Sequence, residues 1–358
     1  MNDNIKSVII GTGHYAPINI IPNDHFLEHS FYEKNGEAIV RGNTEIISKF
    51  QDITEIEERR YADPDQRASD LGFLAAQNAI ESSGIDPEKL DYIIAAHNFG
   101  DIAPGSTRPD VLPTIGSRIK HKLGIKNPDC VAYDLPFGCP GWLQGMIQAD
   151  YFIRSGDAKY ILIIGTETLS RVIDPHDRDS MIFADGAGAT ILEGKQNSAA
   201  GILAHKTQTH THEEAYYLYS ARSSNPDADS QEQFIKMDGR KIYEYALKNV
   251  PLVIQQALQK SDTDITDVKK VLVHQANGKM DEAILKRLFK LYGYRDTPSN
   301  VMPMTISTLG NSSVATIPTL LDLIMKNRMQ DHQFESGDRI VLASVGAGMN
   351  INAMVYQF

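Results

Sequence analysis

The amino-acid sequence predicts an α/β protein made of two halves, and three features of the chain point to this fold class. Strands and amphipathic helices alternate along the chain, as they do in folds built on mostly parallel sheets. Residues 160–165 form a continuous apolar run that is typical of a strand buried on both faces. Each half also ends with two strands whose pattern indicates antiparallel pairing. A polar stretch at 195–199 separates the halves, so we expect an N-terminal half at 1–197 and a C-terminal half at 198–358.

The first half begins with a predicted strand at 6–10 that leads into Gly11-Thr12-Gly13. The third glycine of a dinucleotide-binding fingerprint is absent and no helix start follows, so no nucleotide site is expected there. The polar segment 30–52 is expected to be a surface excursion with a short helix. The other elements expected in this half are a helix at 65–83, a strand at 92–96, a long loop at 100–113, a strand at 131–133, a helix from 142, and strands at 160–165 and 190–192.

The second half contains a polar loop at about 207–233 with histidines and glutamates around it. These residues lack the H-E-x-x-H spacing of a zinc helix, so no metal site is expected. Pro251 should kink the long helix that contains it. The elements expected in this half are strands at 202–204, 271–273, 339–344 and 351–356, and helices at 238–260, from 278 to about 292, and at 314–325.

Composition limits the classes of function that remain. Of 358 residues, 42% are hydrophobic and 23% charged, which is ordinary for a globular protein. The formal net charge of −11 argues against general nucleic-acid binding. Two cysteines form neither a disulfide framework nor a cysteine-rich metal site. The first residues do not resemble a signal peptide and no run reaches the ~18 apolar residues of a membrane-spanning helix. We therefore expect a cytoplasmic protein without a membrane span.

Cys139 lies in a turn between a strand and a helix, and the chain is organised around it. Pro140 suits a first helical position, where a missing N–H has no cost. The unpaired amides at the start of the helix favour a thiolate over a thiol. Gly138 and Gly141 leave room for another molecule to approach. A small buried cysteine is the alternative, because cysteine is among the most buried residue types.

His274 and Asn311 stand at comparable corners, where a strand passes into a helix. A cysteine nucleophile needs a partner that stabilises its charge, and an imidazole with an amide is one workable set. Taken singly, His274 is explained by a strand end and Asn311 by a helix cap. The three residues together predict nucleophilic catalysis.

The motifs around these residues resemble those of β-ketoacyl-acyl-carrier-protein synthase III, of the thiolase superfamily. The resemblance rests on Cys139 in its Gly-Cys-x-Gly turn, His274-Gln275-Ala276-Asn277, Gly310-Asn311-Ser312-Ser313 and the late Gly346-Ala347-Gly348, and it extends over essentially the whole chain. It implies a thiolase-like five-layer αβαβα fold of two duplicated halves, and a homodimer. The extra residues at 100–113 and 207–233 indicate a member from a specialised pathway.

The resemblance also implies a mechanism and roles for particular residues. Cys139 accepts an acyl group from a coenzyme A or carrier-protein thioester, while the backbone N–H groups of Cys139 and Ala347 hold the oxyanion. His274 and Asn311 then stabilise the enolate formed when a malonyl-type thioester loses carbon dioxide. The enolate attacks the acyl group in a Claisen condensation, so the enzyme is an acyltransferase, a ketosynthase, that needs no cofactor.

The resemblance places substrate-binding or carrier-binding residues at Arg178, Lys279, Leu112 and Met237. Arg178 matches an arginine near the family's coenzyme A site. Lys49 and Ile53 stand where the family has a tryptophan and an arginine, and Lys279 replaces a usual arginine, which favours a carrier protein as donor. Leu112 falls where the family places a residue of the partner's acyl pocket. Lys279, Lys286 and Lys290 share a predicted helix face that suits an acidic carrier protein; a solvated surface face explains them equally well.

Other functions remain open at this stage. The same fold performs head-to-head condensation of two acyl thioesters, as in alkylresorcinol or olefin pathways, and acyl transfer to an alcohol or amine. A Cys-His-Asn hydrolase fits the residue order, although the strand–helix pattern around Cys139 argues against it. A non-catalytic partner subunit would be expected to lack the nucleophile. The fold alone does not decide between these outcomes.

Overall fold

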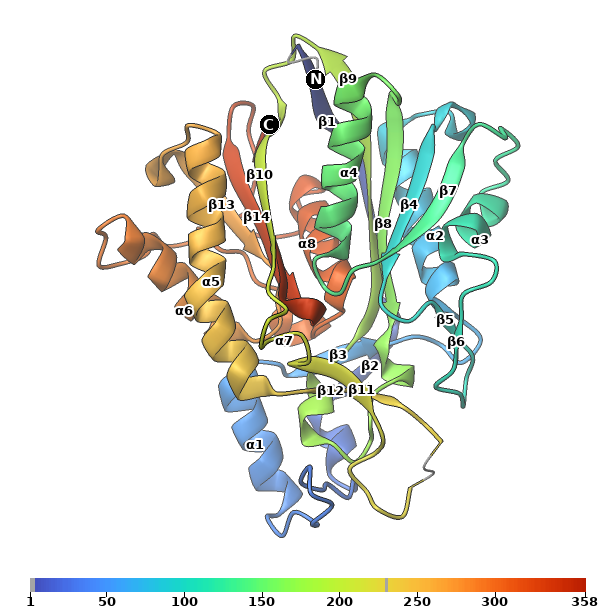
Figure 1. The fold of residues 1–358 in the computed structure, drawn as a ribbon, viewed down its shortest axis with the longest axis vertical. Coiled ribbons are helices and arrows are strands. Elements are labelled where there is room, and N and C mark those ends of the chain that lie inside the picture. The colour runs from blue at the N-terminus through green and yellow to red at the C-terminus, as the bar shows by residue number, and fades with distance from the viewer. Residues whose placement is uncertain (1–3, 229–230) are drawn as a thin grey trace.

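A computed structural model describes residues 4–228 and 231–358 and contains two large sheets (Figure 1). The first sheet has five strands in the order β1 (Ile5–Tyr15), β9 (Asp185–Gln196), β8 (Tyr160–Thr168), β4 (Tyr92–His97) and β7 (Val131–Pro136). The second has four strands in the order β10 (Gly201–Thr209), β15 (Asn350–Gln357), β14 (Arg339–Gly346) and β13 (Val268–Val273).

The two sheets repeat one connection pattern. In the first, β4 is parallel to β7 and β8, and β9 is antiparallel to both β8 and β1. In the second, β13 and β14 are parallel, and β15 is antiparallel to both β14 and β10. The place that corresponds to β7 is taken by irregular chain, in which the carbonyl oxygen of Val301 accepts a hydrogen bond from the backbone N–H of Val271 at 2.9 Å. Both halves thus end in the antiparallel pair that the sequence predicts.

Six helices complete the layers. The central pair, α4 (Gly141–Ser155) and α8 (Thr316–Met325), lies between the sheets, while α2 (Ala68–Ser83) and α3 (Ile115–Lys122) cover the outer face of the first sheet. The outer face of the second sheet is covered by α5 (Gly239–Lys260) and α6 (Gly278–Leu291). Figure 1 shows the resulting order of helix, sheet, helix, sheet and helix layers from left to right. The predicted five-layer αβαβα fold is confirmed.

The layers pack around a core to which both halves contribute. One cluster of buried side chains joins Ile94 and Met146 of the first half to Leu272, Ile317 and Tyr356 of the second. The predicted division at 197/198 falls in the link between β9 and β10 and stays a prediction. Because the central helices need both sheets to bury their apolar sides, we expect the halves to fold as one unit.

The glycines of Gly11-Thr12-Gly13 have a packing role. They lie within β1, and a Cβ built on Gly13 would stand 2.3 Å from the carbonyl oxygen of Ala75 in α2. The missing side chains let α2 lie directly on the strand. This explains the pair of glycines without a bound nucleotide.

Some predicted boundaries and shapes are wrong. The helix expected at 65–83 begins at Ala68, and the helix expected at 314 begins as a 3₁₀ turn, Ser313–Ala315, before α8. The helix α5 runs through Pro251 as one element, and the kink expected there stays a prediction. Each long loop contains a small two-stranded sheet: β5 (Asp101–Ile102) with β6 (Pro109–Asp110), and β11 (Leu218–Ala221) with β12 (Phe234–Met237).

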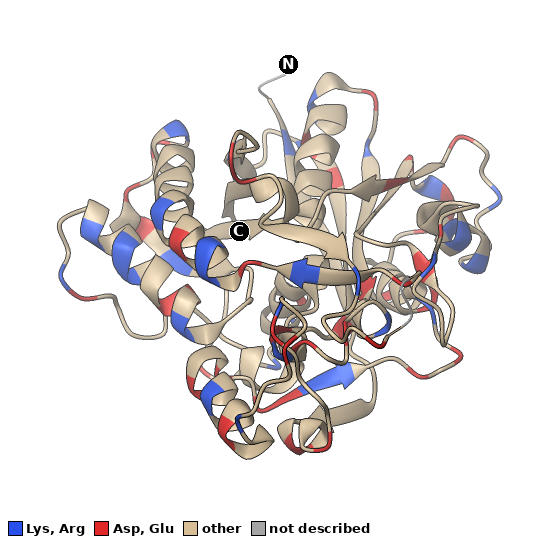
Figure 2. Ribbon diagram, turned by 60° about the horizontal axis from the view of Figure 1, so that its bottom comes forward, with Lys and Arg blue, Asp and Glu red and all other residues tan. Residues whose placement is uncertain are grey.

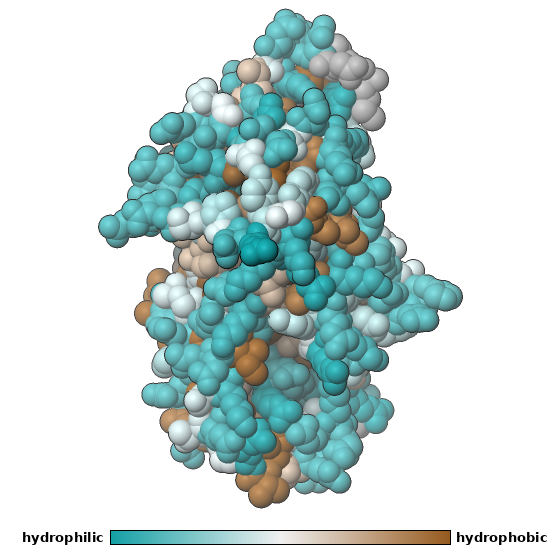
Figure 3. Space-filling view, turned by 90° about the vertical axis from the view of Figure 1, so that its left-hand side faces the viewer, coloured by the Kyte–Doolittle hydropathy of each residue, from teal (hydrophilic) through white to brown (hydrophobic). Residues whose placement is uncertain are grey.

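The remaining elements form the lower part of the molecule in Figure 1. They are β2 (Asn19–Pro22), which pairs with β3 (Glu58–Tyr61), and the helices α1 (Asn43–Thr54) and α7 (Ile306–Leu309). The predicted surface excursion at 30–52 thus contains most of α1. This helix packs against α6. Over residues 4–228 and 231–358, no helix is long and apolar enough to cross a membrane. Figure 3 shows a mostly hydrophilic face with small, separate hydrophobic areas.

Candidate active site

Two cavities lie near the ends of the central helices. The smaller has a volume of about 250 Å³ and is lined by Cys139 together with mostly apolar side chains, among them Phe99, Leu169, Phe183 and Ile235. The larger has a volume of about 810 Å³ and lies between α1, the start of α5 and the start of α6. Met237 lines the larger cavity and Ile235 the smaller, so the strand β12 borders both.

Cys139 stands between the end of β7 and the start of α4, as the sequence predicts. Gly138 before it has φ of 69°, a left-handed conformation that favours glycine. The turn at 346–348 approaches this loop closely, since a Cβ on Gly346 would lie 2.6 Å from the backbone nitrogen of Cys139. A Cβ on Gly138 would lie 2.9 Å from the backbone nitrogen of Ala347. The two backbone N–H groups expected to hold an oxyanion are therefore brought to the same place.

Ser313 connects Cys139 to the second half. Its hydroxyl donates to the Sγ of Cys139 at 3.2 Å, and its backbone N–H donates to the Oδ1 of Asn311 at 2.8 Å. Its carbonyl oxygen accepts from the Thr316 hydroxyl at 3.0 Å, and that hydroxyl contacts the Nδ1 of His274 at 2.7 Å. One residue thus links Cys139, His274 and Asn311, the three residues expected to be catalytic.

His274 follows the last residue of β13 and is 2% exposed. Its backbone N–H donates to the carbonyl oxygen of Ala343 at 2.8 Å, which continues the pairing of β13 with β14. Burial lowers the pKa of His274 to about 4, because the charged imidazolium is poorly solvated there. The imidazole is therefore neutral at pH 7.

Both backbone polar groups of Asn311 are hydrogen-bonded. Its N–H donates to the carbonyl oxygen of Ile182, and its own carbonyl oxygen accepts from Ala184, both at 2.9 Å. The side chain is 3% exposed, and its oxygen is used by Ser313, which leaves the amide nitrogen as its donor group. The helix cap predicted at Asn311 is wrong: Ser312 occupies the N-cap position of the 3₁₀ turn before α8, without a side-chain cap hydrogen bond.

The expectation of a thiolate at Cys139 is opposed by the protein around it. Although Cys139 is partly exposed to the cavity, desolvation raises the pKa of its thiol to about 11. The hydrogen bond from Ser313 acts in the opposite direction and lowers the pKa, while the nearby Glu167 carboxyl raises it. At pH 7 the resting residue is thus a thiol, and a thiolate needs further stabilisation when it forms.

Sequence reasoning missed four polar residues of this site. Asn98 follows the last residue of β4, and Glu167 lies next to the end of β8. Ser313 begins the 3₁₀ turn before α8, and Thr316 is the first residue of α8. Ser313 stood inside the Gly-Asn-Ser-Ser motif that drew attention to Asn311. The other three had no local signal, since a buried polar residue is recognised only when its partners are known.

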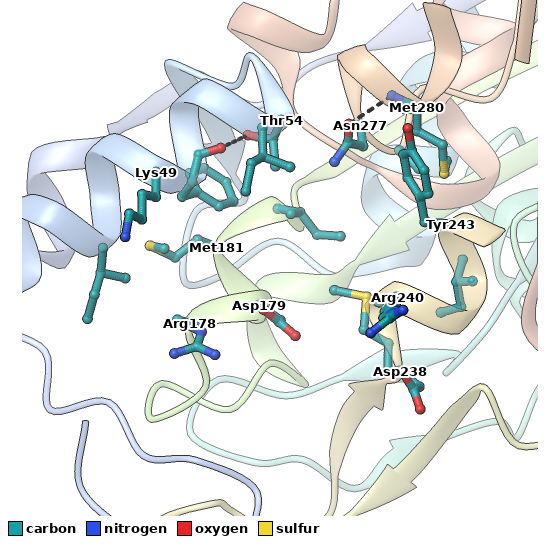
Figure 4. A pocket seen from close by; sticks show the side chains of 18 of the residues that line it. Lys49, Thr54, Arg178, Asp179, Met181, Asp238, Arg240, Tyr243, Asn277 and Met280 are labelled. Carbon is teal, nitrogen blue, oxygen red and sulfur yellow. Dashed lines mark hydrogen bonds between the residues drawn. The ribbon is translucent and has the colours of Figure 1, made fainter. Parts of the chain in front are cut away.

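Of the four residues expected to bind substrate or carrier, two line a cavity and two do not. Arg178 and Met237 line the larger cavity, as do Lys49 and Ile53. Figure 4 shows Arg178 and Lys49 at this cavity. Lys279 is exposed on α6 and does not line either cavity. Leu112 is 82% exposed and also lies outside both cavities. Lys286 and Lys290 are exposed on α6 as well, among the basic residues that Figure 2 shows on the outer helices.

Basic side chains outnumber acidic ones in the lining of the larger cavity. Five are basic (Lys34, Arg41, Lys49, Arg178 and Arg240) and three are acidic (Asp179, Asp238 and Glu244). Arg178 forms an exposed ion pair with Glu33 at 3.0 Å, and Lys49 pairs with Glu45 at 2.9 Å. Such exposed pairs exchange readily for another anion. Within the described ranges 4–228 and 231–358, no three His, Cys, Asp or Glu side chains gather as a metal site.

Comparison with known proteins agrees with this arrangement. The family described as 3-oxoacyl-[acyl-carrier-protein (ACP)] synthase III matches residues 133–211, and the description of its C-terminal part matches residues 258–358. The 3-oxoacyl-[acyl-carrier-protein] synthase III of Aquifex aeolicus VF5 has 26% identity and a TM-score of 0.79, covering 98% of this chain and 100% of its own. The β-ketoacyl-[acyl carrier protein] synthase III of Thermus thermophilus has 27% identity and a TM-score of 0.79, covering 98% and 99%.

The fold extends to a more distant structure, the priming β-ketosynthase of the R1128 polyketide pathway. Its identity is 22% and its TM-score 0.81, with 100% of this chain and 98% of the other covered. Fold and sequence similarity together define the class of protein: an acyltransferase of the condensing type, with a thiolase-like fold. Within that class, the chain belongs to the 3-oxoacyl-acyl-carrier-protein synthase III family.

Proposed function

We propose that this enzyme loads an acyl group on Cys139 and condenses it with a malonyl- or β-ketoacyl-thioester, with loss of carbon dioxide in the malonyl case. The observation that carries the proposal is the set of hydrogen bonds through which Ser313 joins Cys139, His274 and Asn311 at one cavity. Three residues far apart in the sequence meet there, beside a mostly apolar space in which an acyl chain fits.

In the first step, the sulfur of Cys139 attacks the carbonyl carbon of the donor thioester. The backbone N–H groups of Cys139 and Ala347 stabilise the oxyanion, which supplies charge stabilisation where it develops. The carbon–sulfur bond to the donor then breaks, and the departing thiol takes the proton that Cys139 has lost. Because the first product leaves before the second substrate reacts, ping-pong kinetics are expected.

In the second step, His274 and Asn311 donate hydrogen bonds to the carbonyl oxygen of the extender thioester. A neutral histidine suits this role, because a base is unnecessary when decarboxylation itself forms the enolate. The role requires the proton on Nε2, so during this step the single proton of the Thr316 hydroxyl must turn from the Ser313 carbonyl oxygen to Nδ1. The enolate carbon then attacks the acyl carbon on Cys139, and the carbon–sulfur bond to Cys139 breaks. The β-ketoacyl product leaves, and the Cys139 sulfur takes up a proton from solvent.

Head-to-head condensation of two acyl thioesters and acyl transfer to an alcohol or amine are retained as alternative outcomes at the same cysteine. A Cys-His-Asn hydrolase is the remote alternative. The outcomes differ in their need for the second half: enolate chemistry uses His274 and Asn311, whereas plain acyl transfer depends chiefly on Cys139. Product analysis with unlabelled and carboxyl-labelled malonyl donors separates them.

The acyl donor is proposed to be a coenzyme A or carrier-protein thioester, with no further cofactor. The basic lining of the larger cavity supports binding of a phosphorylated donor, whichever carrier delivers it. Arg178 and Met237 line this cavity and are retained as binding residues; the exposed Lys279 is retained only for contact with a carrier protein. A cytoplasmic location also stays a prediction, and cell fractionation tests it.

A homodimer is part of the proposal. The strand β7 lies at the edge of the first sheet, where Val131 is 48% exposed, and Leu112 is 82% exposed. An edge strand with exposed apolar side chains is suited to pairing with a second copy. Sedimentation of the purified enzyme tests this, and a monomer at micromolar concentration would contradict it.

The experiment that tests the function is intact-mass measurement after incubation with a panel of acyl-coenzyme A and acyl-carrier-protein donors. We expect a mass gain of one acyl group with the preferred donor and no gain for Cys139→Ala. Addition of a malonyl donor should then discharge the acyl group as a β-ketoacyl product. A folded protein that gains no mass with any donor would contradict the proposal.

A further inference from the structure

A line of hydrogen bonds joins a buried carboxyl group to the sulfur of Cys139. The backbone N–H of Asn98 donates to the Oε1 of Glu167 at 2.9 Å, and the side-chain amide of Asn98 donates to the same oxygen. The second hydrogen of that amide is directed to the hydroxyl of Ser313, at 2.9 Å. The Ser313 hydroxyl contacts the Sγ of Cys139 at 3.2 Å.

The direction of these hydrogen bonds follows from the chemistry of the groups. Glu167 is 2% exposed, and its oxygen accepts from both N–H groups of Asn98. An amide NH₂ group donates and does not accept, so the oxygen of Ser313 must accept from Asn98. The single hydroxyl proton of Ser313 is therefore left free for the sulfur. The donors that follow in the line, the second amide hydrogen of Asn98 and the hydroxyl of Ser313, are both directed toward Cys139.

The backbone of Ser313 is held in an unusual conformation that makes this contact. Its φ of 52° is left-handed, which is uncommon for a residue other than glycine. Hydrogen bonds to Asn311 and from Thr316 hold its N–H and its carbonyl oxygen. Such conformations persist where the surroundings determine them strongly, and they cluster at functional sites.

We propose that Ser313 is a catalytic residue whose hydroxyl stabilises the Cys139 thiolate, and that Asn98 and Glu167 are positioning residues that set the direction of its hydrogen bond. The inference rests on the proposed role of Cys139 as nucleophile. When the sulfur attacks the thioester carbon, its proton ends on the departing thiol, and the sulfur keeps the hydrogen bond from Ser313 until the new carbon–sulfur bond forms.

Ser313 acts here as a donor and not as a base. An amide does not pass on a proton, so the line from Glu167 to Cys139 does not form a proton relay. Burial also raises the pKa of Glu167 well above its usual range, so the group tends to be neutral and opposes a thiolate less than a carboxylate would. The arrangement stabilises negative charge on the sulfur in a place where burial disfavours it.

The test measures the rate at which iodoacetamide alkylates Cys139 between pH 6 and pH 11, followed by intact mass. A hydrogen bond to a charged group contributes enough for Ser313→Ala to raise the apparent pKa by about one unit, which slows alkylation at pH 7.5 about tenfold. Ser312→Ala is the matched control, because the neighbouring serine is equally small and also buried. It should alkylate like the parent enzyme.

Asn98→Asp tests the direction of the hydrogen bonds without removing Ser313. The new carboxyl group presents an acceptor to Ser313, so the hydroxyl turns from the sulfur to Asp and alkylation slows at least as much as in Ser313→Ala. Thermal unfolding midpoints establish that the variants are folded. An unchanged alkylation profile in folded Ser313→Ala or Asn98→Asp would overturn the inference. The assay needs no acyl donor, so its outcome is separate from that of the acylation test.

Discussion

The two central helices occupy matching places in the two halves, and their first turns carry different chemistry. The helix α4 follows Cys139, and α8 follows the turn that begins at Ser313. The side chains of these two residues meet at 3.2 Å, although 174 positions separate them. The first half thus contributes the proposed nucleophile, and the second half the hydroxyl that contacts it. The repeated architecture places two strand-to-helix corners side by side. One corner carries a thiol and the other the hydroxyl that donates to it.

The proposal divides the reaction between the halves: the first carries the acyl group, and the second forms the enolate. This division makes the comparison testable at His274 and Asn311, because a change there should affect condensation and leave the acylation of Cys139, in which Ser313 and Ala347 of the second half are proposed to take part. The following predictions run from the largest expected effect to the smallest.

Replacing His274 with alanine should separate the two steps. The loss of one donor to a developing oxyanion costs about 10²–10³-fold in rate, so condensation should fall by that factor while Cys139 is still acylated. Single-turnover measurement of each step checks this, with His212→Ala, on an exposed loop, as the control. Equal losses in acylation and condensation would show that the halves do not divide the chemistry in this way.

The contact between the Cys139 loop and the turn at 346–348 should be sensitive to one added methyl group. Gly138→Ala places an alanine in a left-handed conformation, which should lower the free energy of unfolding by about 1–2 kcal/mol. Its Cβ would also lie 2.9 Å from the Ala347 nitrogen, which should lower it by about 1–3 kcal/mol more. Gly105 has a similar φ of 71° and nothing within 4 Å of its Cβ position, so Gly105→Ala isolates the backbone cost.

Chemical denaturation of both variants gives the difference in the free energy of unfolding. Gly138→Ala should also slow the acylation of Cys139, whereas Gly105→Ala should not. Equal destabilisation by the two substitutions would indicate that the halves tolerate separation at this contact.

Acid should destabilise the folded enzyme through buried histidines of the second half. Burial lowers the pKa of His205 and of His274 to about 4, whereas an unfolded histidine titrates near 6.5. Between these values the unfolded state binds protons that the folded state does not, so stability is full above pH 6.5 and falls as the pH drops toward 4. The free energy of unfolding of His205→Gln should therefore fall by about 2 kcal/mol less than that of the parent between pH 7 and pH 5.

Urea unfolding at the two pH values checks this expectation. An equal loss of stability in the parent and in His205→Gln would mean that His205 takes up its proton without unfolding.

The smallest effects are expected for the exposed lysine on α6. Lys279→Ala should change the KM for the acyl donor by less than about threefold, because exposed charges contribute little and are screened by salt. Arg178→Ala, within the larger cavity, should raise that KM about tenfold. Steady-state kinetics with coenzyme A and carrier-protein donors compare the two. A larger effect of Lys279 with the carrier protein alone would locate the docking surface on α6.

Much of the fold was predictable because its signals are local. The apolar run at 160–165 indicated a buried strand, and apolar periodicity indicated a helix from 142; both are confirmed by β8 and α4. Boundaries were less predictable, as at α8, where backbone contacts of Asn311 with a distant strand region impose a 3₁₀ turn before the helix.

The candidate site was predictable in part. Residues at the ends of strands were expected to meet, and Cys139, His274 and Asn311 are indeed linked through Ser313. The roles of Asn98 and Glu167 were not predictable, since their hydrogen bonds join positions 69 and 215 residues apart. The helix start alone predicted a thiolate at Cys139. In the structure, desolvation raises the pKa of this thiol, so the protonated form is favoured.

By itself, the sequence determined the order of strands and helices and the corners at which reactive side chains stand, because periodicity and turn residues act over a few positions. The tertiary structure alone decided which of those corners meet, which lysines and arginines face a cavity, and that the Cys139 thiol is desolvated beside Ser313. These properties depend on contacts between elements far apart in the chain, and on desolvation, which arises only when the layers have packed around the side chain.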